Sequence, residues 1–264
     1  MAVQGGTGGL RWSQARRAGR IAAGDAAGLI SPRAPHSVAN LSAAVCNEYQ
    51  LRARRADYDA AFRAVGADVL WLDPEPNRPL DGAFRPTDRA PILRRSPEGR
   101  IEGLEARWWL VPGFYRGPLS DWKAMCTNAR IETAATTASF RDAVRTGRCL
   151  APVTAVFEYD APPGWRKGQP KRRWEVSWPA DDASGPVRFM AGLCARSRPA
   201  DLPEGLDSFA VITRPAGADM SRIHDRQPVI LPLAEGLTWL DRGGLEALPG
   251  PGPGGSLNLR EAPR

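Results

Sequence analysis

Apolar residues recur at two spacings along this chain, and each spacing predicts a different kind of element. In residues 54–65 they fall three and four positions apart, the spacing of one helix face, and residues 136–144 indicate a second helix. Elsewhere apolar residues run together between Pro, Gly and charged residues, as in buried strands. We expect such strands at residues 91–94, 108–111, 189–194, 209–213 and 229–231, and one or two strands within residues 149–157. Because strands and short helices do not alternate regularly, the pattern predicts a mixed α+β domain.

The composition changes near both ends of the chain. Residues 1–44 are rich in Ala and Gly, hold five arginines against one acidic residue, and keep no amphipathic pattern. Such a segment is typical of a transit peptide or a disordered tail. From residue 45 the pattern is that of a globular domain, which we expect to reach residue 242. Residues 243–264 are rich in Pro and Gly and are expected to be flexible.

The composition of the whole chain narrows its class. With 25% charged and 42% hydrophobic residues, it has the profile of a soluble globular protein. No apolar run approaches the ~20 residues that a membrane span needs, so we expect no membrane partner. The four cysteines form no C-x-x-C pair, which argues against a zinc site and a disulfide framework. Free thiols fit a reducing cytoplasm, and we expect neither a metal nor another cofactor.

The positive charge is concentrated in one segment. A net charge of +7 permits a polyanionic partner. Five cations lie in residues 164–173, between strand-like segments at 154–159 and 174–178. This arrangement predicts a long basic hairpin loop, which either contacts phosphates or is simply a solvated loop.

A small set of polar residues can carry proton-transfer chemistry. His224 is the single histidine after the N-terminal segment, and histidine titrates near neutral pH. Asn128 and Glu158 lie upstream, the latter inside an aromatic strand. An amide, a carboxylate and an imidazole form a plausible catalytic set. Taken alone, His224 could equally be a surface histidine at a turn.

Four motifs in this order resemble the SOS response-associated peptidase (SRAP) family, whose members crosslink to abasic sites in single-stranded DNA. They are Cys46, the run Asn-Ala-Arg-Ile-Glu-Thr at 128–133, the strand holding Glu158, and His-Asp-Arg-Gln-Pro at 224–228. The resemblance covers roughly residues 45–241. It implies a single domain with a mostly antiparallel, barrel-like β core flanked by short helices, acting as a monomer on single-stranded DNA.

The resemblance also implies a role for each motif residue. Cys46 would be the N-terminal nucleophile, and Asn128, Glu158 and His224 would complete the catalytic set. The DNA-binding residues that it implies are the phosphate-contacting Arg130 and Arg226, and Phe114 and Tyr115, which would wedge against unstacked bases. The family commonly has Gly-Arg after the cysteine, whereas Asn47 and Glu48 follow it here.

The implied reaction requires a free amine on Cys46. An α-amino group has a pKa of ~7.7–8.0, so much of it is neutral at pH 7 and can condense with the aldehyde of an abasic site. The thiol of the same residue then closes a thiazolidine ring intramolecularly. Forty-five residues precede Cys46, so its nitrogen is an amide in this chain. We hypothesise that residues 1–44 result from a wrong start assignment, with Val45 as the true initiator position, and that removal of residue 45 by an aminopeptidase or by self-cleavage exposes Cys46.

Two other classes of function remain open. A thiol-dependent peptidase could use Cys46 and His224 with Glu158 or Asn128, acting on its own leader or on peptides. Turnover of an added peptide would favour that reading, and a single-turnover DNA adduct would favour the crosslinker. A non-catalytic DNA-binding module would bind abasic and intact strands equally well after Cys46→Ala.

Overall fold

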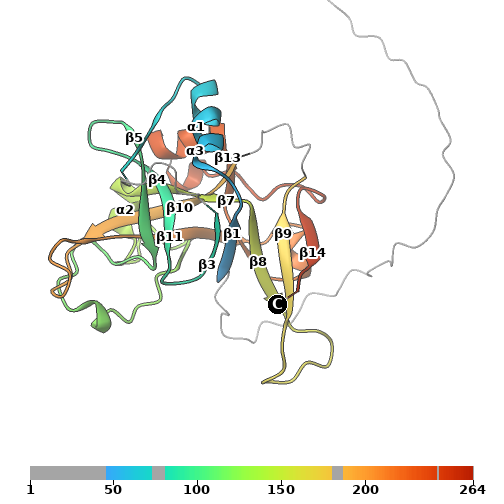
Figure 1. Cartoon of the computed structure of the whole chain (residues 1–264). Coiled ribbons are helices and arrows are strands. Elements are labelled where there is room, and N and C mark those ends of the chain that lie inside the picture. The colour runs from blue at the N-terminus through green and yellow to red at the C-terminus, as the bar shows by residue number, and fades with distance from the viewer. Residues whose placement is uncertain (1–45, 73–80, 180–186, 243, 264) are drawn as a thin grey trace, which may run out of the picture. The chain divides into compact units, whose positions relative to one another are not determined.

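The computed structural model describes residues 46–72, 81–179, 187–242 and 244–263, so the predictions for residues 1–44 lie outside the described residues. Strands dominate these ranges, and the helices are short (Figure 1). The helical segments are α1 (Arg55–Ala64), α2 (Arg141–Thr146) and α3 (Leu233–Arg242), with the 3₁₀ turns η1 (Leu119–Asp121), η2 (Met220–Arg222) and η3 (Leu245–Ala247). Among the described helices, none has the length and apolar composition needed to cross a membrane.

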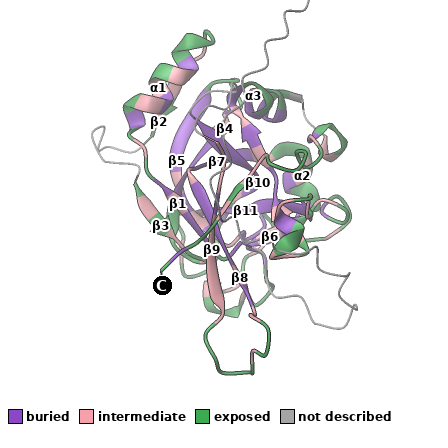
Figure 2. Ribbon diagram, turned by 90° about the vertical axis from the view of Figure 1, so that its right-hand side faces the viewer, coloured by how far each residue is buried: buried purple, intermediate pink, exposed green. Residues whose placement is uncertain are grey.

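One sheet is antiparallel throughout and joins both ends of the described chain. Its strand order is β14-β9-β8-β1-β3. The strands are β1 (Glu48–Leu51), β3 (Gly82–Phe84), β8 (Ala155–Asp160), β9 (Arg172–Ser177) and β14 (Asn258–Glu261). Strands β8 and β9 form the predicted hairpin, and their loop projects away from the sheet (Figures 1 and 2). Pairing of β1 with β8 places the chain next to Cys46 beside the strand that contains Glu158.

The second sheet closes on itself. Its main path runs β11-β10-β7-β4-β5, and a short parallel pairing of β5 with β11 completes a five-stranded barrel. The barrel strands are β4 (Arg89–Arg95), β5 (Ile101–Trp108), β7 (Arg148–Val153), β10 (Arg188–Ser197) and β11 (Leu206–Pro215). Four shorter strands extend it, namely β2 (Val69–Trp71), β6 (Asn128–Arg130), β12 (Arg226–Pro228) and β13 (Ile230–Pro232). Closure leaves these barrel strands without a free edge.

Aromatic side chains fill the space between the two sheets. Trp108 lies at the centre, fully buried, with the ring of Tyr49 5.2 Å away and that of Phe209 6.4 Å away. The indole nitrogen of Trp108 donates to the carbonyl oxygen of Thr127 at 3.0 Å, so its one polar atom is satisfied. Cys46 belongs to this same buried cluster.

Helices α1 and α3 cover one end of the barrel, opposite the β8–β9 loop (Figure 2). Helix α1 presents Tyr58 and Phe62 to Phe189, with ring centroids 5.6 and 6.0 Å apart. Helix α3 was not predicted from the sequence. It contains Gly236, which disfavours a helix in isolation, but a Cβ there would lie 3.0 Å from Leu150, so the glycine allows close packing.

The predicted elements agree with the structure to different degrees. The α+β prediction with a mostly antiparallel, barrel-like core is confirmed, and so are the helix at 54–65 and the strands around 91–94, 189–194 and 209–213. The strand at 108–111 is wrong beyond Trp108, where β5 ends, because Trp109 and Leu110 leave the ladder and Leu110 bonds to Cys126. The helix at 136–144 is shorter and later, at α2.

The C-terminal segment is more ordered in the structure than its composition indicates. Strand β14 pairs with β9, although the sequence predicts flexibility there. Asp219 accepts hydrogen bonds from the backbone N–H groups of Gly255 and Leu257 at 2.9 and 3.0 Å and from the Ser256 hydroxyl. Burial would raise the pKa of Asp219, but these hydrogen bonds outweigh it and the pKa is lowered. A distant carboxylate therefore orders a segment whose own composition does not.

Candidate catalytic and DNA-binding site

Cys46 and Glu158 are in direct contact. The backbone N–H of Cys46 donates to Glu158 Oε1 at 2.6 Å, and both residues are buried. The contact follows from the pairing of β1 with β8, in which Glu48 lies opposite Phe157. Cys46 has a φ of +50°, a left-handed conformation that is unfavourable for a residue with a side chain. The nitrogen that the predicted reaction needs is therefore held against a carboxyl group.

The environment of Glu158 favours its protonated form. Burial raises the pKa of this carboxyl to about 8, although hydrogen bonds from the Cys46 and Tyr159 backbones pull in the opposite direction. The Asp225 charge raises the pKa further, and the Lys171 charge lowers it. At neutral pH most molecules therefore carry a proton on Glu158, beside the Cys46 nitrogen.

The thiol of Cys46 is not activated in this state. Burial raises the pKa of this thiol well above its ordinary value, and the Glu158 charge adds to the effect. Its Sγ makes a weak contact of 4.0 Å with the carbonyl oxygen of Glu48. Within the described residues, no hydrogen bond joins Cys46 Sγ to His224. A thiolate is the reactive form of cysteine, so this sulfur is a poor nucleophile before the site changes.

His224 lies in the turn between η2 and β12. Its N–H donates to the Met220 carbonyl oxygen, and its Nδ1 accepts the N–H of Arg226 at 3.0 Å. That bond favours the tautomer with the proton on Nε2. Burial lowers the pKa of His224, against the opposing Asp225 carboxylate at 2.9 Å. The Lys171 charge affects the pKa of both His224 and Glu158, which indicates that the two groups share one electrostatic environment.

Strand β11 brings the two polar motifs together. Its end pairs with β6, which begins at Asn128, and also with β12. Arg226 of β12 makes a bidentate ion pair with Glu132, with distances of 3.0 and 2.9 Å, and also donates to the Thr213 carbonyl oxygen. Burial would raise the pKa of Glu132, but the Arg226 hydrogen bond, a backbone hydrogen bond and the charges of Arg226 and Arg130 together lower it. Arg226, predicted to contact phosphate, is thus a clamp between the two motifs in this structure.

Asn128 and Arg130 lie at the two ends of β6. Asn128 is half-buried, and its amide donates weakly to the Thr127 hydroxyl at 3.4 Å. Arg130 is exposed, and its charge contributes to the lowered pKa of Glu132. Of the two predicted phosphate-contacting arginines, Arg130 is therefore the more accessible.

The predicted aromatic wedge divides into two different environments. Phe114 is 52% exposed, whereas the Tyr115 ring packs 4.9 Å from Trp122 and its hydroxyl donates to the Pro118 carbonyl oxygen. Phe114 presents a ring to solvent, and Tyr115 holds the loop. Met125, which sequence reasoning did not single out, is also exposed, at 64%.

The basic segment at 164–173 is partly neutralised. Arg172 pairs with Asp160, and Arg173 donates to the buried carboxylate of Glu48 at 2.7 Å. Arg166 and Lys167 are exposed in the loop. Counting charges along the sequence could not distinguish the paired cations from the exposed ones, because the acids that pair with Arg172 and Arg173 lie on other strands.

Glu48 places a negative charge at a position where the resemblance predicts a positive one. The family pattern has Arg here, yet this Glu is buried and also accepts the Tyr159 hydroxyl at 2.5 Å. Burial would raise its pKa, but the Arg173 and Tyr159 hydrogen bonds outweigh that effect and the pKa is lowered. A hollow beside Glu48 is lined by Arg85, Lys171 and Arg173, so positive charge surrounds this position despite the acid.

The described residues contain no cluster of His, Cys, Asp or Glu that could hold a metal ion. The described residues thus offer a buried carboxyl on the Cys46 nitrogen and an imidazole with a lowered pKa, and they also present an exposed arginine, Arg130, and an exposed aromatic ring, Phe114.

Comparison with known proteins gives this arrangement a context. A family model described as SOS response associated peptidase (SRAP) matches residues 45–249. The abasic site processing protein YedK of Escherichia coli is 26% identical over 197 residues, covering 74% of this chain and 79% of that protein. The abasic site processing protein YoqW of Bacillus subtilis is 30% identical over 152 residues, covering 57% of this chain and 61% of that protein.

Solved structures share the fold. A crystal structure of a protein from Bacteroides thetaiotaomicron matches with a TM-score of 0.66 at 22% identity, covering 82% of this chain and 91% of that one. At this identity the likeness concerns the fold alone. The family match is stronger evidence, since it spans the barrel and includes Cys46, Asn128, Glu158 and His224. The chain therefore belongs to the SRAP family.

Proposed function

We propose that this protein processes abasic sites in single-stranded DNA by forming a covalent thiazolidine through Cys46, after residues 1–45 are removed. The observation that carries the proposal is the 2.6 Å hydrogen bond from the Cys46 nitrogen to Glu158. The names of the relatives, abasic site processing proteins, support the substrate class. The remaining steps follow from the chemistry of the groups around that nitrogen.

Glu158 is suited to assist release of the Cys46 amine. Hydrolysis of the bond between Val45 and Cys46 consumes one water, leaving a carboxylate on Val45 and a nitrogen that must take up a proton. Glu158 holds a proton at neutral pH and lies on that nitrogen. The left-handed φ of Cys46 adds strain next to the bond to be cleaved.

Release changes the role of Glu158. A new ammonium group beside the carboxyl favours its ionised form, so Glu158 can then accept a proton from Cys46 and leave a neutral amine. The amine adds to the aldehyde carbon, and a proton from Glu158 allows water to leave, giving an imine. The thiol adds to the imine carbon and its proton goes to nitrogen, so amine, thiol and aldehyde yield one thiazolidine and one water.

The other predicted residues support this reaction. We assign His224 to opening the deoxyribose ring, through the proton on Nε2, and Asn128 to holding the sugar or its phosphate. Exposed Arg130 would contact a phosphate, in an interaction that weakens with salt, and exposed Phe114 would stack on a base next to the lesion. Arg226 would contribute by holding the two motifs in register through Glu132.

A thiol-dependent peptidase is the weaker candidate. It needs a thiolate on Cys46, whereas burial raises the pKa of that thiol. Release of the leader through Glu158 does not need one. Repeated turnover of an added peptide by the processed protein would favour the peptidase.

The decisive experiment is a denaturing-gel assay with single-stranded DNA that carries one abasic site. The protein is expressed with Met at position 45 as its first residue, and mass spectrometry confirms that Cys46 is the free N-terminus. We expect a shifted band that is lost in Cys46→Ala and retained in Cys126→Ala, a matched change of another buried cysteine. Glu158→Gln should slow adduct formation on the order of a hundredfold or more. No band from protein with a free Cys46 would contradict the proposal.

Self-processing is tested separately on the full chain. Loss of residues 1–45 from the wild type but not from Glu158→Gln would support cleavage by the site itself. Equal processing of both proteins in cells, and none after purification, would assign the removal to another enzyme.

A further inference from the structure

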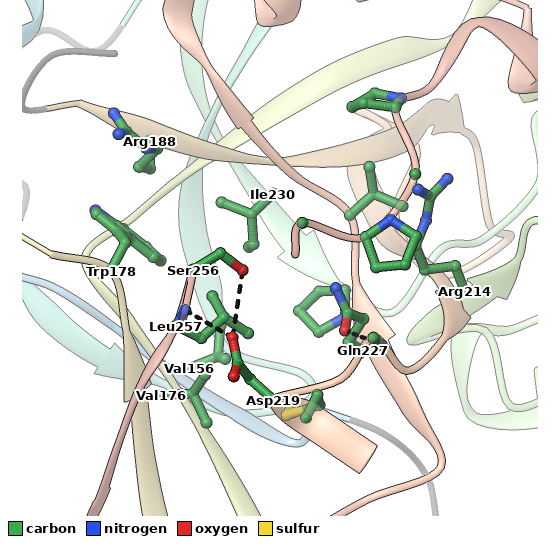
Figure 3. A pocket seen from close by; sticks show the side chains of 18 of the residues that line it. Val156, Val176, Trp178, Arg188, Arg214, Asp219, Gln227, Ile230, Ser256 and Leu257 are labelled. Carbon is green, nitrogen blue, oxygen red and sulfur yellow. Dashed lines mark hydrogen bonds between the residues drawn. The ribbon is translucent and has the colours of Figure 1, made fainter. Parts of the chain in front are cut away.

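A cavity of about 450 Å³ lies under the C-terminal segment (Figure 3). Its walls come from β8, β9, β11, β12 and β13, and residues 249–253 form part of its cover. Cys46, Asn128, Glu158 and His224 do not line it. Its volume is in the range of small-molecule sites. The site described above therefore gives this cavity no role.

Arg214 is the feature that points to a ligand. It lines the cavity and is 7% exposed, yet within the described residues its guanidinium has no hydrogen bond or ion pair, and its Nε is buried without a partner. Burial lowers the pKa of Arg214, opposed by the Glu132 charge. The Glu132 carboxylate already forms an ion pair with Arg226. Because arginine stays charged in proteins, this buried cation lacks the counterion that would offset its desolvation.

The acids that line the cavity do not supply that counterion. Asp219 is held by Ser256 and by the Leu257 N–H, as the dashed lines in Figure 3 show, so it holds the cover in place. Glu235 is exposed on α3 and makes no ion pair in the described part of the chain. A second buried arginine, Arg188, adds further positive charge to the wall.

The rest of the lining suits a planar apolar group. Trp178 lies across the cavity from Arg214 in Figure 3, with Ile230 between them, and Val176 and Leu257 add further apolar lining. Gln227, on the Arg214 side, uses its Oε1 to accept the Gly217 N–H at 2.7 Å, which leaves its amide N–H groups to donate. The Arg214 side of the cavity therefore offers cationic and amide donors, and the opposite side offers the aromatic surface of Trp178 beside Arg188.

We propose that this cavity binds a small anion with a planar body, either an aromatic carboxylate or a nucleoside monophosphate. Its anionic group would lie on Arg214 and Gln227, and its ring against Trp178. Both kinds of ligand share this chemistry, and binding does not depend on Cys46 or on DNA. The site is thus separate from abasic-site processing, and either proposal can fail without the other.

Calorimetry and thermal melting on the full chain test the proposal with four probes: phenylacetate, thymidine monophosphate, uncharged thymidine and inorganic phosphate. We expect binding of phenylacetate or of thymidine monophosphate, with a raised melting temperature, and weaker binding of the other two. Whichever of the two aromatic anions binds shows whether the natural ligand carries a carboxylate or a phosphate. No binding of either at millimolar concentration, or equal binding of thymidine, would overturn the proposal.

Variants locate the site. Arg214→Met should weaken binding of the probe about tenfold or more. The melting temperature of the free protein should not fall, because the substitution removes an uncompensated buried charge. Arg145→Met, an exposed arginine on α2, is the matched control and should leave binding unchanged. Trp178→Leu, at a half-exposed position, is the second test and should weaken aromatic anions selectively. Unchanged affinity in both cavity variants would place the ligand elsewhere and refute the inference.

Discussion

Replacing Glu158 by Gln should make the folded, unprocessed protein more stable at neutral pH. Burial raises the pKa of this carboxyl from its ordinary value of 4.5 to about 8. Between these two values the folded state keeps a proton that the unfolded chain has released. Stability is therefore full below pH 4.5 and falls as the pH rises toward 8. Gln cannot ionise, and its side-chain oxygen can still accept the Cys46 N–H.

The size of the effect follows from the same values. Each pH unit inside this window costs the folded state about 1.4 kcal/mol, so the wild-type carboxyl has lost about 3 kcal/mol at pH 7 relative to pH 4.5. The Gln variant should be more stable by about that amount at pH 7, with a gap that narrows toward pH 4.5. Free energies of this size are a large part of a domain's stability.

The comparison needs proteins that do not process themselves. We would place Glu158→Gln in a Cys46→Ala background, confirm by mass that both proteins retain residues 1–45, and follow urea unfolding by circular dichroism between pH 5 and pH 8. Glu48→Gln in the same background is the control of opposite sign. Hydrogen bonds from Arg173 and Tyr159 outweigh burial and lower the Glu48 pKa, so that variant should lose most stability at neutral pH. A Glu158 stability difference that is constant across the pH range would refute the raised pKa.

Three further predictions concern the clamp, the loop and the core. The variants Arg226→Gln and Glu132→Gln, made singly and together, should show a coupling free energy of about 1 kcal/mol in urea unfolding. The coupling is modest because Glu132 is partly exposed. A coupling of zero would mean that the ion pair does not stabilise the fold. Arg166→Gln with Lys167→Gln should reduce the salt slope of single-strand binding by about two in fluorescence anisotropy, and an unchanged slope would remove the loop from the interface. Phe62→Ala should cost about 3–5 kcal/mol in urea unfolding, since the ring is fully buried against Phe189; a loss under 1 kcal/mol would show that this packing is unimportant.

Local pattern accounts for the elements that were predicted well. The hairpin at 154–159 and 174–178 became β8 and β9, and long apolar runs became β10 and β11, because each carries its signal within a few residues. Several of the elements that were missed are short, although helix α3 is not. Strands β1 and β6 have four and three residues, too few to show a period, and they form because distant strands offer them hydrogen bonds.

For the candidate site, too, the sequence predicted the residues but not their contacts. Motif order predicted Cys46, Asn128, Glu158 and His224 as the catalytic set, and of these the structure brings Cys46 and Glu158 into direct contact. Motif order predicted a phosphate contact for Arg226, and the structure shows its pair with Glu132, 94 positions away. No sequence signal marked Arg214, because its lack of a partner among the described residues depends on which acids fold toward it.

The sequence by itself determined the α+β class, the local elements with strong periodicity, and the residue types available for chemistry. The tertiary structure decided what those residues can do. It brought Cys46 to Glu158 across 112 positions, buried the carboxyl so that its pKa rose, paired some cations and left Arg214 without an ion pair among the described residues. Periodicity is a property of neighbours along the chain, whereas burial and charge pairing depend on all the groups that folding gathers around a residue.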